Sequence, residues 1–162
     1  MSAKTQPSHS SLWLGLAETH QLSKRYSSAL VYWEKLVGDK EDENWHDYEL
    51  KSGICKIQTG KIEEGVEIVN RFHKAKNNDP IVCYNSGCYY AIAAGLTDDK
   101  EVSSACAEKA IGFIREAGEK EFFTPAMKSH VASDKDLNPL RELESFKKLC
   151  RDFELSLKAT EL

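Results

Sequence analysis

The 162-residue sequence lacks long hydrophobic runs, an excess of basic residues and closely spaced cysteine pairs. No apolar run approaches the roughly 18 residues that a membrane span needs, and the N-terminal segment MSAKTQPSHSS lacks the apolar core of a signal peptide. The net charge is −4, and Lys and Arg are scattered among the acids, so no basic patch for nucleic acid is expected. We therefore expect a protein that binds neither a membrane nor nucleic acid.

The five cysteines are odd in number and widely spread, and none forms a Cys-x-x-Cys pair. This usage predicts small buried side chains in a reducing compartment, which favours a cytoplasmic location. A thiol-based redox protein that uses Cys83 or Cys88 is an alternative. A thiol pKa well below that of a free cysteine would favour it.

Motifs for phosphate, metal or catalytic chemistry are also missing. The sequence has no glycine-rich phosphate loop, and neither His46 nor His73 has an acid or a cysteine at metal-ligand spacing. Residues 134–138 (Asp-x-Asp-x-Asn) start like a calcium loop, but Pro139 takes the place of the required glycine, and helix capping explains the same residues. We expect no catalytic residue, no metal and no cofactor, and a protein that is not an enzyme.

Helical periodicity dominates the chain from residue 10 onward, with only three of the four prolines, Pro80, Pro125 and Pro139, to interrupt it. Trp13 and Ala17 share one helical face, and after a polar break at 23–25 the residues Ala29, Trp33 and Leu36 repeat the spacing. Two short amphipathic helices with so tight a connection fold back as an antiparallel hairpin. Neither helix can bury its apolar face alone, so the pattern predicts stacked helical repeats.

The pattern recurs in the following residues. Gly53 follows Ala17 by 36 positions, and Gly65 follows Ala29 by the same number. This spacing places small residues where the two helices of a second hairpin cross. Gly60 takes the turn position of that hairpin. A third hairpin begins at the pair 79–80 (Asp-Pro), and Gly118 is the expected C-terminal glycine of its second helix.

The last 40 or so residues do not continue the repeat. Thr124 and Pro125 read as an N-cap and first helical residue, and the pair 138–139 (Asn-Pro) predicts the start of a final helix. An apolar stripe marks that helix: Leu140, Leu143, Phe146, Leu149, Cys150, Phe153 and Leu157. We expect it to cover the open apolar end of the repeats, and a partner-binding face is the alternative.

The first hairpin fills the signpost positions of the roughly 34-residue tetratricopeptide repeat, with Lys24 where glycine is usual. The signposts are Trp13, Leu16, Ala17, His20, Tyr26, Ala29, Trp33 and Leu36. The closing segment 134–141, followed by Phe146, resembles that of bacterial tetratricopeptide proteins, as does the stretch 84–88 (Tyr-Asn-Ser-Gly-Cys) in the first helix of the third hairpin. The resemblance implies an all-α solenoid of about three helix-turn-helix repeats (10–43, 46–79 and 80–118) with capping helices over 124–132 and 139–158. These form one domain, 10–162, after a disordered tail, 1–9.

The resemblance also implies an adaptor or scaffold that binds a peptide or amphipathic helix of another protein in a concave groove. It places eight residues there: Leu14, Glu18, Leu50, Lys51, Ile54, Tyr84, Asn85 and Cys88. The amide of Asn85 can both donate to and accept from a peptide backbone, although a bond to a neighbouring helix is equally compatible. Some tetratricopeptide proteins hold the C-terminal carboxylate of their partner with basic and amide side chains. Glu18 stands where such a clamp needs a neutral or basic group, so we do not expect one here. A small cytosolic chaperone that shields an apolar segment of its partner is an alternative, and homo-oligomer formation stays open.

Overall fold

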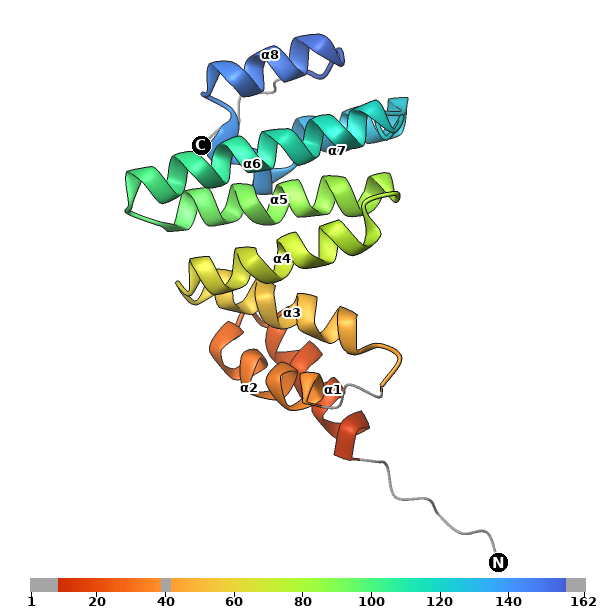
Figure 1. The fold of residues 1–162 in the computed structure, drawn as a ribbon, viewed down its shortest axis with the longest axis vertical. Helices are drawn as coiled ribbons and strands as arrows, with labels where there is room; N and C mark the ends of the chain where they lie inside the picture. The colour runs from red at the N-terminus through yellow and green to blue at the C-terminus, as the bar shows by residue number, and fades with distance from the viewer. Residues whose placement is uncertain (1–8, 39–41, 157–162) are drawn as a thin grey trace, which may run out of the picture. The chain divides into compact units, whose positions relative to one another are not determined.

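A computed structural model describes residues 9–38 and 42–156, and over these residues all regular secondary structure is helical (Figure 1). The α-helices are α1 (His9–Leu22), α2 (Tyr26–Val37), α3 (Trp45–Gln58), α4 (Ile62–Lys76), α5 (Pro80–Leu96), α6 (Lys100–Glu119), α7 (Pro125–Ser133) and α8 (Glu144–Asp152). A 3-10 helix, η1 (Lys135–Leu140), precedes α8. The all-α class is confirmed. The predicted tail lies outside the described residues except for His9, which begins α1.

The chain divides within α4 into two compact units, one up to Ile68 and one from Val69 onward. The bounds of α1 to α6 match the helices of the three predicted hairpins. Their stacking into one solenoid domain stays a prediction. Across the described residues, none of the helices is both long and apolar enough to cross a membrane.

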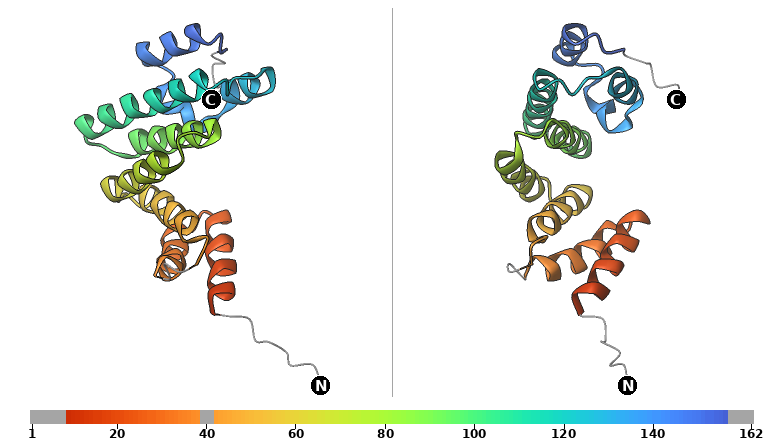
Figure 2. Two further views of the ribbon diagram at one scale, coloured as in Figure 1. Left: turned by 45° about the vertical axis from the view of Figure 1, so that its right-hand side comes forward. Right: turned by 90° about the vertical axis from the view of Figure 1, so that its right-hand side faces the viewer.

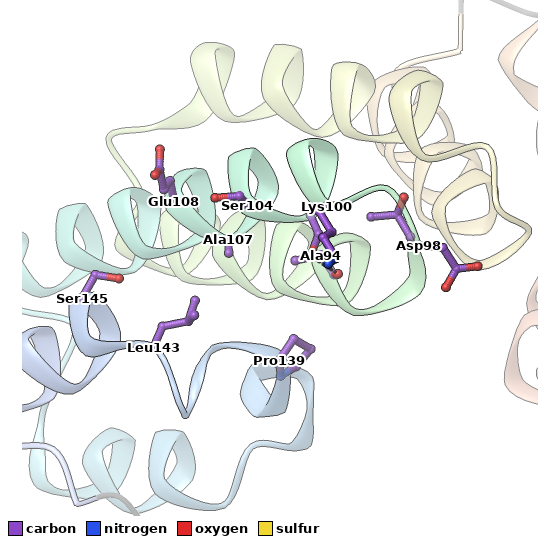
Figure 3. Close-up of a pocket in the computed structure, with 11 residues that line it drawn as sticks. Ala94, Asp98, Lys100, Ser104, Ala107, Glu108, Pro139, Leu143 and Ser145 are labelled. Carbon is purple, nitrogen blue, oxygen red and sulfur yellow. Dashed lines mark hydrogen bonds between the residues drawn. The ribbon is translucent and has the colours of Figure 1, made fainter.

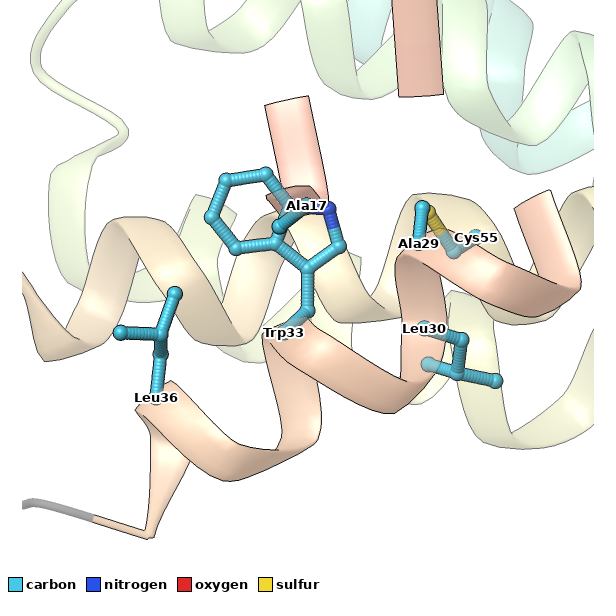
Figure 4. Packing of buried hydrophobic residues seen from close by; sticks show 6 residues of the cluster. All are labelled: Ala17, Ala29, Leu30, Trp33, Leu36 and Cys55. Carbon is cyan, nitrogen blue, oxygen red and sulfur yellow. The ribbon is translucent and has the colours of Figure 1, made fainter. Parts of the chain in front are cut away.

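The core of the first unit is a cluster of small and large apolar side chains from α1, α2 and α3 (Figure 4). Its members are Ala17, Ala29, Leu30, Trp33, Leu36 and Cys55. The two alanines are fully buried and let the helices approach, while Trp33, only 2% exposed, fills the space between them. The indole N–H of Trp33 donates to Gln21 Oε1 at 2.8 Å, so its buried polar atom is satisfied.

The crossing of α3 and α4 depends on two glycines, as the sequence predicted. A Cβ at Gly65 would lie 2.6 Å from Gly53 O, and a Cβ at Gly53 would lie 2.8 Å from Ile68 Cγ2. Any larger side chain at either position would force the helices apart. Gly60 joins them with φ of +85°, a conformation that suits glycine and confirms its predicted place in the turn.

In the second unit, α5 and α6 run antiparallel and lie side by side in every view (Figures 1 and 2). The side chain of Asp79 accepts from Ile81 N at 2.8 Å and caps α5, with Pro80 at the first helical position. Asp99 caps α6 in the same way. Gly87 permits the close crossing, because a Cβ there would lie 2.5 Å from Ile114 Cγ1.

Gly118 is not the C-terminal glycine that the sequence predicted. It lies inside α6, where a Cβ would come within 2.6 Å of both the Phe123 and Phe153 rings. Glu121 instead takes the left-handed conformation after the helix, with φ of +62°. Gly118 therefore serves the packing of two aromatic rings rather than the helix end.

The single helix predicted over 139–158 is also wrong, because residues 135–152 form η1, a break and then α8. Pro139 lies inside η1, and the Arg141 guanidinium donates to Asp134 O at 2.8 Å, which closes the turn before the helix can start. Asp134 caps η1 by accepting from Asp136 N at 3.0 Å, so the capping role predicted for this segment is confirmed. Along the predicted stripe Leu140, Phe146, Leu149 and Cys150 are buried and Leu143 is exposed, whereas Leu157 lies outside the described residues.

Candidate functional site

The eight predicted groove residues differ widely in exposure. Leu14 and Leu50 are half-buried; Glu18, Lys51 and Asn85 are exposed; Ile54, Tyr84 and Cys88 are buried. Glu18, Lys51 and Asn85 are thus open to a partner, whereas the buried three belong to packed interiors. Five of the eight lie in the first unit and three in the second.

Tyr84 and Asn85 line a common cleft of about 390 Å³ in the second unit. Its wall on α5 also includes Pro80 and Ile81, and its other wall is formed by Glu121 and Phe122 before α7 and by Met127 and His130 on α7. Ile81 is 55% exposed at this cleft, so it adds apolar surface to the α5 wall. The cleft therefore offers an apolar surface with an exposed amide beside it.

The Tyr84 side chain is held in place at the bottom of the cleft and does not project out of it. Its hydroxyl donates to Asp134 Oδ2 at 2.7 Å, and its ring stacks on Phe122 with centroids 4.7 Å apart. Burial raises the pKa of Tyr84, so the hydroxyl stays protonated and acts as a donor. Cys88 lies on the same side, with Sγ 3.7 Å from Asp134 Oδ2. Both side chains tie α5 to the start of η1.

The groove residues predicted from the sequence include two on the α5 wall of this cleft, Tyr84 and Asn85, and none on the opposite wall. Ile81 lies three and four residues before Tyr84 and Asn85, so helical spacing alone would have added it to the set. Phe122 and Met127 come from the connection after α6 and from α7, and no local pattern links them to α5. Only the folded chain brings them together.

A second pocket of about 460 Å³ lies beside the turn between α5 and α6 and the segment before α8 (Figure 3). It is lined by Ala94, Thr97, Asp98, Lys100, Ser103, Ser104, Ala107, Glu108, Pro139, Leu143 and Ser145. Its charged residues carry both signs, and the Ser103 hydroxyl already donates to Ala94 O at 2.8 Å. The lining contains no histidine or cysteine that could activate a serine. This pocket has no assembled catalytic chemistry.

All five cysteines are free and buried. Burial raises the pKa of each thiol, and that of Cys55 reaches about 11. Redox-active cysteines need exposed thiols of low pKa. Cys83 and Cys88 have neither property.

One polar cluster in the second unit was not expected from the sequence. His73 of α4, Cys83 of α5 and Glu116 of α6 bring their side-chain donor atoms within 4.8 Å of one another. The sequence offered His73 no neighbouring ligand, because the other two residues are 10 and 43 positions away along the chain. Three packed helices supply the proximity that local spacing does not.

The chain matches no known family model, no curated protein and no solved structure in the comparisons made. The resemblance to tetratricopeptide proteins therefore rests on the residues and helices described above.

Proposed function

We propose that the protein is a non-enzymatic interaction module of the tetratricopeptide type, an adaptor or scaffold that works in the cytoplasm. In this proposal the cleft at Tyr84 and Asn85 binds an amphipathic helix or extended segment of another protein. The observation that carries it is the exposed Ile81 next to an apolar cleft that contains two predicted groove residues. The antiparallel hairpins and their glycine crossings support the repeat class.

The chemistry of the cleft favours a partner segment with an apolar anchor. One side chain of such a segment would fill the space between Tyr84, Phe122 and Met127, and would cover Ile81. The exposed amide of Asn85 would then hydrogen-bond the partner's backbone. Tyr84 would act as a rigid wall, because its hydroxyl is held by Asp134.

The two alternative functions fare differently. A small chaperone would use the same cleft for an apolar segment of its partner, so it differs from an adaptor in the partner rather than in the site. A redox protein is disfavoured, since Cys83 and Cys88 are buried and their thiol pKa values are raised. A second copy of the chain is a further partner for the same surface.

The proposal is tested by selecting binding peptides from a displayed random library and measuring their affinity by fluorescence anisotropy. Ile81→Glu adds a charge at the cleft and should weaken binding by at least about tenfold, which corresponds to about 1.4 kcal/mol. Leu96→Glu is the matched control, because Leu96 is 50% exposed at the opposite end of α5 and lies outside the cleft.

Loss of binding in Ile81→Glu with retention in Leu96→Glu would support the proposal. Failure to enrich any peptide, or equal binding by the two variants, would contradict it. Sedimentation analysis of the protein alone, together with the two variants, would show whether a second copy occupies the cleft.

A further inference from the structure

The cluster of His73, Cys83 and Glu116 contains a buried nitrogen without a hydrogen bond. His73 is only 5% exposed, and among the described residues its Nε2 atom has no hydrogen-bond partner. Buried polar atoms of this kind are rare and call for an explanation, such as a bound ion. Nε2 points toward Glu116, whose Oε2 lies 3.0 Å away in a geometry that does not form a hydrogen bond.

An ordinary His–Glu ion pair does not explain this contact. Glu116 already has a cationic partner, because Lys120 Nζ lies 2.6 Å from its other oxygen, Oε1. An imidazole nitrogen 3.0 Å from a carboxylate oxygen, without a hydrogen bond between them, is an arrangement that a cation between them would stabilise.

The distances suit a small metal ion. Zinc bonds of about 2.0–2.3 Å place neighbouring ligand atoms of a tetrahedral site about 3.3–3.6 Å apart. The Nε2–Oε2 distance of 3.0 Å is close to that range, and the three donor atoms all lie within 4.8 Å of one another. The other separations, of at most 4.8 Å, would have to shorten by up to about 1 Å when the ligands close on the ion. Such a shift is available to Glu116, which is half-exposed.

We propose that His73 Nε2, Cys83 Sγ and Glu116 Oε2 bind one zinc ion, with water as the fourth ligand. Imidazole, thiolate and carboxylate together are typical of zinc, whereas magnesium and calcium prefer oxygen ligands alone. The water position would lie on the side of Glu116, because Cys83 is fully buried and His73 nearly so.

Zinc binding has two consequences in this site. The Cys83 thiol, which points to Asn77 O at 3.2 Å, gives up its proton to solvent and forms the zinc–sulfur bond. The ion then joins α4, α5 and α6 directly, since each helix supplies one ligand. Zinc would therefore stabilise the second unit by linkage, whichever partner the cleft binds.

The test uses untagged, reduced protein from which metal has been removed with a chelator. Cobalt(II) is added as a spectroscopic substitute for zinc, and zinc is then added in competition. We expect one equivalent of cobalt to give a thiolate-to-cobalt charge-transfer band that zinc removes. Cys83→Ala should lose the band, and Cys106→Ala, which removes a buried cysteine outside the cluster, should keep it.

A second pair of variants covers the case in which Cys83→Ala does not fold, as judged by circular dichroism. Glu116→Gln keeps the shape of the side chain and should weaken zinc binding by at least about tenfold. Glu108→Gln, an exposed residue on the same helix, should leave it unchanged. The proposal is overturned if the wild type gives no charge-transfer band, if the band persists in folded Cys83→Ala, or if the two glutamine variants bind zinc equally.

Discussion

At the scale of single residues, three turns depend on backbone conformations that L-amino acids adopt at a cost. Lys24, Glu121 and Glu154 have φ of +55°, +62° and +55°, and they follow α1, α6 and α8. For residues with a Cβ this region costs roughly 1–2 kcal/mol. The tetratricopeptide pattern that the sequence resembles normally has glycine at the position of Lys24. The sequence pattern and the backbone conformation therefore both favour glycine at this position.

Lys24→Gly should therefore stabilise the protein by about 0.5–1 kcal/mol, after allowance for the greater freedom of glycine in the unfolded chain. The measurement is urea unfolding followed by circular dichroism. Lys51→Gly is the control, because Lys51 is exposed in the middle of α3 and should lose about 1 kcal/mol. A destabilised Lys24→Gly variant would show that the turn does not carry this strain.

The cysteines give a second prediction at this scale. Because all five thiols are buried and their pKa values are raised, the native metal-free protein should react slowly with an aromatic disulfide reagent. All five should react promptly in denaturant. The native protein could instead contain one thiol that reacts fast. If that reaction were lost in Cys83→Ser or Cys88→Ser, the result would support the alternative of a redox protein.

At the scale of elements, small residues decide how closely paired helices approach. Gly53 and Gly65 face each other between α3 and α4, and Gly87 has the same role between α5 and α6. Sequence could predict the first crossing because the glycines recur at the spacing of Ala17 and Ala29. It could not predict the end of α6 or the start of α8, since tertiary contacts of Gly118 and Arg141 override the local signals there.

Gly65→Ala tests the crossing directly. Alanine is the better helix former by about 1 kcal/mol, yet its Cβ would lie 2.6 Å from both Gly53 O and Ile57 Cγ1. We expect overpacking to dominate and to destabilise the protein by about 1–3 kcal/mol in thermal or urea unfolding. Gly15→Ala in α1 is the control, since a Cβ there meets nothing within 4 Å, and it should stabilise. Stabilisation by both variants would contradict the close crossing.

At the scale of the whole molecule, the proposed cleft and the histidine cluster consist of side chains that the fold gathers from distant parts of the sequence. The resemblance to the tetratricopeptide repeat was enough to name Tyr84 and Asn85 as groove candidates, and both lie on one helix, α5. It could not reveal Phe122 and Met127 opposite them, nor that Tyr84 would be buried against Asp134. For the same reason, the sequence did not predict the cluster around His73, because Cys83 and Glu116 come from two other helices.

Photocrosslinking inside the cells that produce the protein is the most direct test of partner binding at the cleft. Ile81, at the cleft, is replaced by a photoreactive phenylalanine analogue, and exposed Glu108, on α6 outside that cleft, is replaced in a control. We expect a discrete crosslinked partner from position 81 and none from position 108. Crosslinks of equal yield from both positions, or none from position 81, would contradict binding at this cleft.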